Sequence, residues 1–388
     1  MKPTNSQMPI LSFFSGAGFL DLGFLDEGFD ILWHNECHGP FVAAYETGVS
    51  ALGYNTASNK IQNRKKVKSL TPKVILEEAF GGRSPGYFGI IGGPPCPDFS
   101  RGGKNKGQNG ANGKLTRNFV GKIAKLKPVF FLLENVPGLL ETKKHRKFLF
   151  SMLGLLSEDF AVDVKVLNAL EYGVPQDRRR VFVVGFSRKW LRQGYAEQYK
   201  GIVSKSGAIV KWGMAGEGVF CACKTAHWFQ WPEPTHPGAK DDYPWPKIVV
   251  NGRVSRRPNK CPKELTVDYH FKLIRGHPNG GDFFRPRSKK FQTTKEGDTS
   301  RKSFKRLHRF RYSPNAAYGN NEVHMHPTEN RRLTVAEALA IQSVPEEYYF
   351  PPEMTLTDKF KAIGNGVPVK LSQAVASSIA KFIQRGCA

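Results

Sequence analysis

The chain has 388 residues, of which 40% are hydrophobic and 23% charged, and its formal net charge is +25. This length exceeds what one ordinary hydrophobic core supports, so we expect two domains. So large an excess of lysine and arginine indicates a polyanionic partner, with nucleic acid the first candidate and an anionic membrane surface the alternative. No apolar run is long enough to span a bilayer and the N-terminus lacks a signal-peptide pattern, which predicts a cytoplasmic protein without a membrane partner.

Cysteine usage agrees with a reducing compartment. The six cysteines are too few and too scattered for a disulfide framework. Three of them, together with His227, lie close enough in sequence to suggest zinc, namely Cys221, Cys223 and Cys261. Their spacing matches no common zinc knuckle, so we expect no metal site.

The first readable unit is a strand at 10–14, a glycine turn at 15–19, a helical stretch ending at Gly28, and a second strand at 31–34. An acid, Glu36, follows the second strand about twenty residues beyond the glycines of the turn. Glycines let a ligand approach the backbone, and such an acid can accept hydrogen bonds from ribose hydroxyls. The pattern favours a nucleotide-binding half-unit, and a plain tight turn between strand and helix is the alternative.

Cys96 follows a short apolar strand at 88–91 and stands on a rigid turn with the sequence GGPPCPDFS. A cysteine in this position is held still above the sheet and could act as a nucleophile. A lone cysteine is more commonly a buried free thiol, so it is the rest of the chain that favours the nucleophile. A stretch rich in glycine and lysine follows, from Arg101 through Gly113. This composition predicts a mobile basic loop that could close over a substrate, or else an ordinary surface loop.

Glu134 comes directly after a buried strand at 129–133, as Cys96 comes after its own strand. In an open α/β sheet this carboxyl edge is where ligands gather. Two further strands are expected at 162–167 and 181–186. Between them, Gln176, Arg178 and Arg180 alternate and should share one face of an extended chain.

The character of the sequence changes near residue 188, where aromatics, prolines and basic residues crowd without periodicity. The basic tract comprises Lys289, Lys290, Lys295, Arg301, Lys302, Lys305, Arg306, Arg309 and Arg311. We expect a loop-rich domain whose surface faces a phosphate backbone, although a solvated charge run is possible.

After the basic tract, Thr334 to Glu337 forms a capping box. A glycine turn at 362–368 and a closing helix with an apolar stripe then return to the first domain. The resulting division is a catalytic and cofactor-binding part at 1–187, a target-recognition domain at 188–327, and a return to the catalytic domain at 328–388.

These blocks together resemble the DNA cytosine-5 methyltransferases. The matching sequences, in the order of that family, are FSGAG at 14–18, PC at 95–96 with FS at 99–100, ENV at 134–136, Q-x-R-x-R at 176–180, the segment 331–350, and GNG at 364–366. The chain departs from the family in offering no acid at 65–72 to contact a cofactor adenine, and in the length and glycine content of the loop after Ser100.

The resemblance implies an α/β, Rossmann-like methyltransferase domain that uses S-adenosylmethionine, with a second, smaller, loop-rich target-recognition domain. It also implies the site residues. The catalytic ones would be Cys96, Glu134, Arg178 and Arg180, with no metal. Those that bind the cofactor would be Phe14, Gly16, Ala17, Gly18, Glu36, Cys37, Pro95 and Asn365.

In the chemistry that this implies, the Cys96 thiolate adds to C6 of a flipped-out cytosine and makes C5 electron-rich enough to accept a methyl group. Glu134 would supply a proton or hydrogen bond at N3, and Arg178 and Arg180 would hold O2.

The expected substrate is double-stranded DNA. The expected enzyme is monomeric, of the bacterial restriction-modification type, with a cognate restriction endonuclease as a functional partner. A tRNA cytosine-5 methyltransferase of the same fold, or a catalytically dead DNA-binding relative, are the alternatives. The long basic region argues against the first, and the joint presence of Cys96, Glu134, Arg178 and Arg180 argues against the second.

Overall fold

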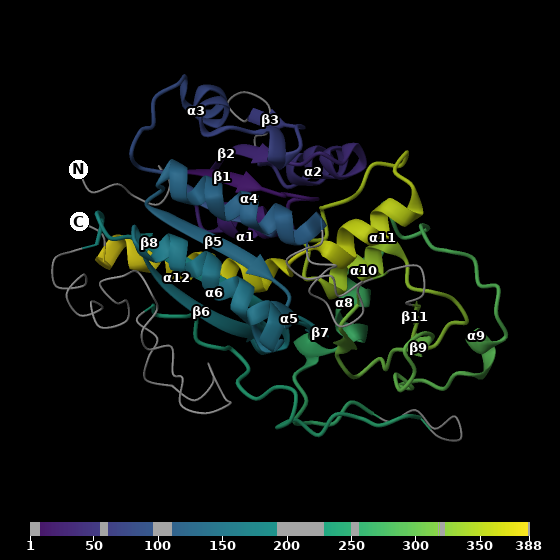
Figure 1. Cartoon of the computed structure of the whole chain (residues 1–388). Coiled ribbons are helices and arrows are strands. Elements are labelled where there is room, and N and C mark those ends of the chain that lie inside the picture. The colour runs from purple at the N-terminus through teal and green to yellow at the C-terminus, as the bar shows by residue number, and fades with distance from the viewer. Residues whose placement is uncertain are drawn as a thin grey trace.

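A seven-stranded sheet forms the centre of the computed structural model, which describes residues 8–54, 61–95, 111–191, 229–249, 256–316, 318 and 323–386 (Figure 1). The strands of this sheet are β1 (Pro9–Phe13), β2 (Asp30–Asn35), β3 (Ile61–Asn63), β4 (Gly89–Gly92), β5 (Phe130–Asn135), β6 (Phe160–Asn168) and β8 (Arg179–Ser187). Four short strands form two separate pairs, β7 (Gln176–Asp177) with β10 (Ser313–Pro314) and β9 (Lys305–Arg306) with β11 (His324–Met325). The helices are α1 (Phe19–Asp26), α2 (Gly39–Ala51), α3 (Pro72–Phe80), α4 (Ala111–Leu126), α5 (Gly138–Glu141), α6 (Lys143–Ser157), α8 (Val267–Leu273), α9 (Lys290–Thr293), α10 (Val335–Ile341), α11 (Leu356–Asn365) and α12 (Val369–Gly386).

The order of strands in the sheet is β3-β2-β1-β4-β5-β8-β6. The first five of these strands run parallel, whereas β8 is antiparallel to both β5 and β6. The chain moves outward in one direction from β1 to β3 and in the other from β4 to β5. The point of reversal therefore lies between β1 and β4, and ligands of doubly wound sheets bind at the carboxyl ends of the strands that flank this point.

Helices cover both faces of the sheet, with α4 and α6 in front of it in Figure 1 and α1 and α12 behind. Strand β5 shows how the two cores are divided. Phe130 and Leu132 pack into the cluster that contains α1, α2 and α12, whereas Phe131 and Leu133 pack with α3, α4 and α6. This follows from the alternation of side chains along a strand, and it confirms the predicted α/β, Rossmann-like class.

The predicted closing helix is confirmed as α12, whose stripe is buried at Leu371, Val375, Ile379 and Phe382. It packs directly on α1, where a Cβ on Gly23 would overlap the backbone of residues 372 and 373. The C-terminal segment thus packs onto the sheet and helices formed by the N-terminal segment.

All six strands predicted in the N-terminal half form, as β1, β2, β4, β5, β6 and β8. One boundary is corrected, because Glu134 is the penultimate residue of β5 and does not lie beyond it. The cause is pairing with β8, which continues through Glu134 opposite Phe182 and Asn135 opposite Val181. Sequence alone does not reveal an antiparallel neighbour that prolongs a strand.

Two predicted loops are also corrected in part. Gly113 is helical, in α4, because the packing of that helix through Phe119 and Ile123 outweighs the low helix propensity of glycine. The glycine turn expected at 362–368 begins only at Gly366, since α11 runs to Asn365. The rest of the basic loop, at 101–110, lies outside the described residues. The capping box at Thr334 is confirmed at the start of α10.

Between residue 229 and α11, each described helix or strand has at most 7 residues. Phe229 packs against Phe186 and Phe382, and its backbone N–H donates to Asp163 Oδ2 at 3.1 Å. Trp231 joins the same core cluster. The catalytic core therefore includes part of the segment that we assigned to target recognition.

The basic tract is not a uniform cationic surface. Arg306 is buried and donates to the backbone carbonyls of Phe291, Thr294, His326 and Glu329 and to the Asn330 side chain. Arg309 forms a two-pronged ion pair with Glu296, with contacts of 3.0 and 2.9 Å. The expectation that the tract faces phosphate is therefore wrong for these two residues, which hold loops together instead.

No helix among the described residues is long and apolar enough to cross a membrane.

The close approach of α1 and α12 leads to a stability test. Gly23→Ala should lower the free energy of unfolding by about 1–3 kcal/mol, because the added methyl group overpacks the interface. Gly154→Ala, in the middle of α6 with no atom within 4 Å of its Cβ position, should be neutral or stabilising by about 0.5–1 kcal/mol. Denaturant unfolding followed by circular dichroism measures both, and equal effects would contradict the packing described.

Candidate active site

The turn between β1 and α1 exposes its backbone at the carboxyl edge of the sheet. Phe14, Gly16 and Gly18 all have positive φ, at 54°, 57° and 86°. A Cβ at Gly16 would meet only the Phe14 carbonyl oxygen, at 4.0 Å, so a ligand has room above it. At Gly18 the reason for glycine differs, since a Cβ there would lie 2.9 Å from the Tyr45 ring.

Glu36 follows β2 and lies against this turn. Its carboxylate accepts from the backbone N–H of Gly16 at 3.2 Å and of His38 at 2.8 Å. The predicted pairing of a glycine turn with the acid after the second strand is thus present in space. Glu36 is only half-buried, which leaves its carboxylate able to accept further hydrogen bonds.

The other residues expected at the cofactor come from four segments. Ala17 belongs to the first turn, Cys37 and Pro95 are exposed after β2 and β4, and Asn365 is exposed at the end of α11. Desolvation, and next the charge of Glu36, raise the pKa of the Cys37 thiol, which therefore stays neutral. A Cβ on Gly366 would overlap the ring of Phe19, so the end of α11 lies against the start of α1.

Cys96, Phe99 and Ser100 lie outside the described residues, which end at Pro95. The turn that leads to Cys96 is nevertheless fixed at its base. The Asn135 side chain donates from Nδ2 to the Pro94 carbonyl at 3.1 Å and accepts at Oδ1 from Val136 N–H at 2.9 Å. A Cβ built on Gly93 would lie 2.9 Å from Glu134 Oε2. The Pro-Pro turn and Glu134 are therefore direct neighbours.

Glu134 and Arg180 form a buried ion pair at this edge. Glu134 Oε1 lies 2.9 Å from Arg180 Nε, and each side chain is only 9% exposed. Burial raises the pKa of the Glu134 carboxyl above its ordinary value, and the guanidinium groups of Arg180 and then Arg178 oppose the rise. The site therefore holds a carboxyl group that is predisposed to take up a proton beside a fixed positive charge.

Arg178 has a different set of contacts. Its side chain is fully buried. It donates to Asn315 Oδ1 at 3.0 Å and to the backbone carbonyls of Ala316, Gly364 and Gly366 at 2.9, 2.7 and 2.8 Å. Two of these acceptors lie at the end of α11, where the last carbonyls of a helix lack partners of their own. These contacts favour a positioning role for Arg178 over the direct contact with substrate that the sequence suggested.

Asn135 is the site residue that the sequence analysis passed over. It stands inside the ENV block, yet only the acid of that block was given a role. The available signal was a polar side chain at the end of an otherwise apolar strand, where buried amides need partners. Among the described residues, no group of three or more histidine, cysteine or acidic side chains could hold a metal ion.

The chain belongs to the C-5 cytosine-specific DNA methylase family, whose model matches residues 8–381. It is thus a DNA cytosine-5 methyltransferase. It is 43% identical to the Type II methyltransferase M.NmeDI of Neisseria meningitidis serogroup C, over 97% of this chain and 84% of that protein. It is also 28% identical to the Type II methyltransferase M.MthTI of Methanothermobacter thermautotrophicus, over 97% and 98% of the two chains.

Solved structures share the fold at lower identity. A putative DNA modification methyltransferase encoded within an Escherichia coli prophage superimposes with a TM-score of 0.58 at 20% identity, covering 98% of this chain and all of that chain. Spodoptera frugiperda DNMT2 gives a TM-score of 0.57 at 15% identity, with the same coverage.

Replacing Arg178 tests its positioning role. Arg178→Met should lower the free energy of unfolding by about 3 kcal/mol or more, because several buried acceptors lose a charged donor. Arg179→Met removes an exposed ion pair with Glu141 and should change stability by less than about 1 kcal/mol. Chemical denaturation of the two variants measures the difference. An Arg178→Met protein of undiminished stability that fails to methylate would instead support direct contact with substrate.

Proposed function

We propose that this enzyme transfers a methyl group from S-adenosylmethionine to C5 of a flipped-out cytosine within a specific duplex DNA sequence, through a covalent bond between Cys96 and C6. The observation that carries the proposal is the buried Glu134–Arg180 pair, directly beside the Pro94–Pro95 turn that leads to Cys96. Family membership makes cytosine the base that such a site would hold.

Each residue has a defined task in this reaction. The Cys96 thiolate attacks C6, and its electron pair raises the electron density at C5, which can then accept a methyl group. Glu134 donates a proton or hydrogen bond to N3 as charge develops on the ring, and Arg180 holds O2 while it orients Glu134. Loss of the C5 proton to a base then expels the thiolate and restores the aromatic ring. Arg178 acts indirectly, by fixing the strand from which Arg180 projects.

The turn after β1 suits S-adenosylmethionine. The open backbone around Gly16 leaves space for the cofactor, and Glu36 can accept from ribose hydroxyls while it holds Gly16 N–H. Phe14, Ala17, Gly18, Cys37, Pro95 and Asn365 would complete the cofactor site. The bound cofactor supplies an electrophilic methyl group, and the described residues orient it toward the edge that carries Glu134.

The charge of two helices supports a nucleic acid as the bound polymer. Helices α4 and α6 contain no acidic residue, and their N-terminal halves carry Lys114, Arg117, Lys143, Lys144, Arg146 and Lys147. Cations in the first turn of a helix interact unfavourably with the helix dipole, and each lowers helix stability by about 0.3–1 kcal/mol. Both helices follow strands that end at the catalytic edge, so these cations are suited to phosphates there.

The named relatives are Type II methyltransferases, which supports a restriction-modification role with double-stranded DNA as substrate. A cognate endonuclease as functional partner, a monomeric state and a cytoplasmic location remain part of the proposal. Transfer of labelled methyl groups from S-adenosylmethionine to a plasmid and to tRNA tests the choice of polymer. Bisulfite sequencing of the plasmid then identifies the site. Methylation of tRNA alone would favour the tRNA alternative, and inactivity on both would favour a dead relative.

The proton-donor role of Glu134 predicts a pH dependence. Burial raises the pKa of Glu134, and Glu134 loses its proton as the pH rises through that pKa. The rate of single-turnover methylation should therefore fall as the pH rises through the same range. Glu134→Gln keeps a hydrogen-bond donor but cannot transfer a proton. It should bind S-adenosylmethionine normally, methylate about 10²–10⁴-fold more slowly, and show no such fall in rate with rising pH. Weakened cofactor binding with an intact methyl-transfer rate would rule out the donor role.

Exchange of the middle region tests target recognition. Residues 188–327 would be replaced by the matching segment of a relative with another recognition sequence, while Phe229 and Trp231 are retained because they pack in the core. The methylated site should follow the inserted segment. An active chimera that methylates the original site would contradict the assignment of this region.

A further inference from the structure

We propose that Arg332 is a phosphate-binding residue that receives one phosphodiester of the DNA backbone at the junction between the catalytic core and the recognition region. The proposal rests on the proposed function only in taking duplex DNA as substrate. Arg332 lies in the family block at 331–350, but the resemblance assigns it no role. A phosphate contact here would be separate from the contacts proposed at the catalytic edge.

The contrast between two adjacent arginines supports this assignment. Arg331 pairs with Glu337 and Glu329, with N–O contacts of 2.7 Å to each. Glu337 is also the acid of the capping box that starts α10. Arg332, the next residue, has no hydrogen-bond acceptor and no acidic partner among the described residues, although its side chain is half-buried.

Other arginines in comparable surroundings are satisfied. Burial lowers the pKa of Arg188, Arg306 and Arg332. Arg188 donates to the Ser157 carbonyl at 3.2 Å, and Arg306 donates to several carbonyl groups. A partly desolvated guanidinium without an acceptor loses free energy that an oxyanion would restore. An unmatched arginine of this kind is therefore poised for an anionic ligand.

The surroundings hold the guanidinium in place. The Arg332 Cζ lies 5.1 Å from the centroid of the Phe284 ring, and Phe284 is stacked in turn on Phe360 at 5.5 Å. Arg332, Phe284 and Phe360 line a small open cavity together with Tyr318, His324 and Leu333. Stacking on an aromatic ring restricts the side chain while its N–H groups stay free to donate, which pre-organises it for a bidentate contact with phosphate.

The cavity lies close to the segments that Arg178 holds. Phe360 is one turn before Gly364 on α11, and Tyr318 is two residues beyond Ala316. Arg178 donates to the carbonyls of both Gly364 and Ala316. A phosphate bound at Arg332 is thereby placed relative to the catalytic strand through rigid elements. Such a contact fixes the register of the duplex and carries no base information.

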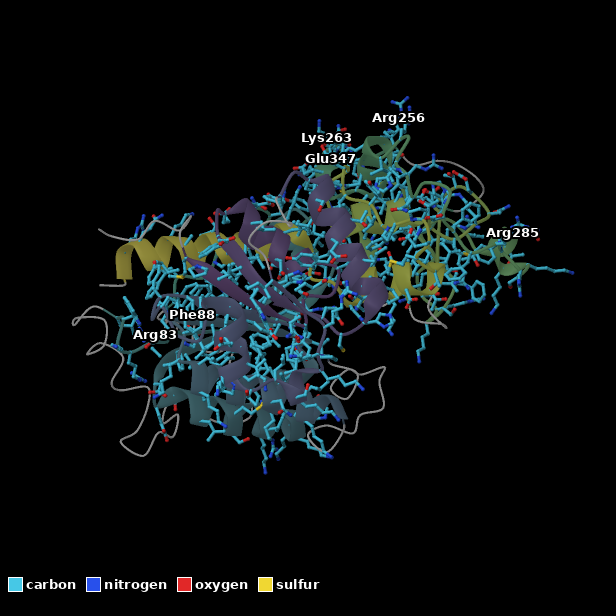
Figure 2. The ribbon with its side chains drawn as sticks, turned by 90° about the horizontal axis from the view of Figure 1, so that it is seen from above. Arg83, Phe88, Arg256, Lys263, Arg285 and Glu347 are labelled. Atoms are coloured by element: carbon cyan, nitrogen blue, oxygen red, sulfur yellow. The ribbon has the colours of Figure 1, made fainter. Side chains whose placement is uncertain are left out.

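Two matched variants test the proposal. Arg332→Gln and Arg83→Gln each remove one positive charge, but Arg83 is exposed at the opposite end of the molecule from the recognition-region residue Arg285 (Figure 2). For Arg332→Gln the slope of log affinity against log salt should fall by about 0.9, as for one lost phosphate contact. The loss of affinity should be equal for cognate and unrelated duplexes. Arg83→Gln should bind as the wild type does.

A scan of duplexes that each carry one neutral methylphosphonate locates the contact. A methylphosphonate at one position of the DNA should weaken binding by the wild type but not weaken binding by Arg332→Gln any further. Methylphosphonates at the other positions should weaken binding by both proteins equally. Under single-turnover conditions with saturating DNA, Arg332→Gln should methylate at the wild-type rate, because Arg332 touches no reacting atom.

Stability separates this role from a structural one. If Arg332 serves DNA, Arg332→Gln should leave the midpoint of thermal unfolding unchanged or raise it, since an unmatched half-buried charge is removed. A lowered midpoint with an unchanged salt slope would overturn the proposal and make Arg332 a structural residue. If the wild type binds and methylates duplex DNA but no methylphosphonate position is silenced by Arg332→Gln, the proposed function stands and this inference fails.

Discussion

A single buried guanidinium joins three parts of the chain that are far apart in sequence. Arg178, the residue before β8, donates to residues 315 and 316 of the recognition region and to residues 364 and 366 at the end of α11. A buried charge of this kind is tolerated only when its donors are matched, and four acceptors within 3.0 Å provide that match. The positions of the recognition region and of the last family block are therefore both tied to one strand of the sheet.

The same strand carries the chemistry. Arg180 follows Arg178 by two residues and pairs with Glu134 on the neighbouring strand β5. Asn135, next to Glu134, in turn holds the Pro94 carbonyl at the base of the turn that leads to Cys96. Positioning and catalysis are thus linked through side chains that alternate along two paired strands. Because those strands are rigid, the carboxyl group and the arginine can be pre-organised before a base enters the site.

Much of this arrangement could be predicted from the sequence, because strand runs, glycine turns and the capping box are local signals. The spacing of the glycine turn and Glu36 indicated one nucleotide-binding unit, and the two lie in contact in the structure. What remained out of reach depends on tertiary contacts. The antiparallel β8 prolongs β5 so that it includes Glu134, Arg178 turns toward α11, and Arg306 turns inward from a run that looks uniformly basic. In each case the partner lies at least 12 residues away in sequence, and no local pattern encodes it.

The central claim is that the buried pair at β5 and β8 serves a covalent attack by Cys96, and trapping tests it most directly. A duplex containing 5-fluorocytosine at the methylated position should form a stable adduct with the enzyme and S-adenosylmethionine, because fluorine cannot leave as the C5 proton does. Peptide mapping by mass spectrometry should place the adduct on Cys96, and Cys96→Ser should form none. A stable adduct that persists in Cys96→Ser, or that maps to another residue, would contradict the account.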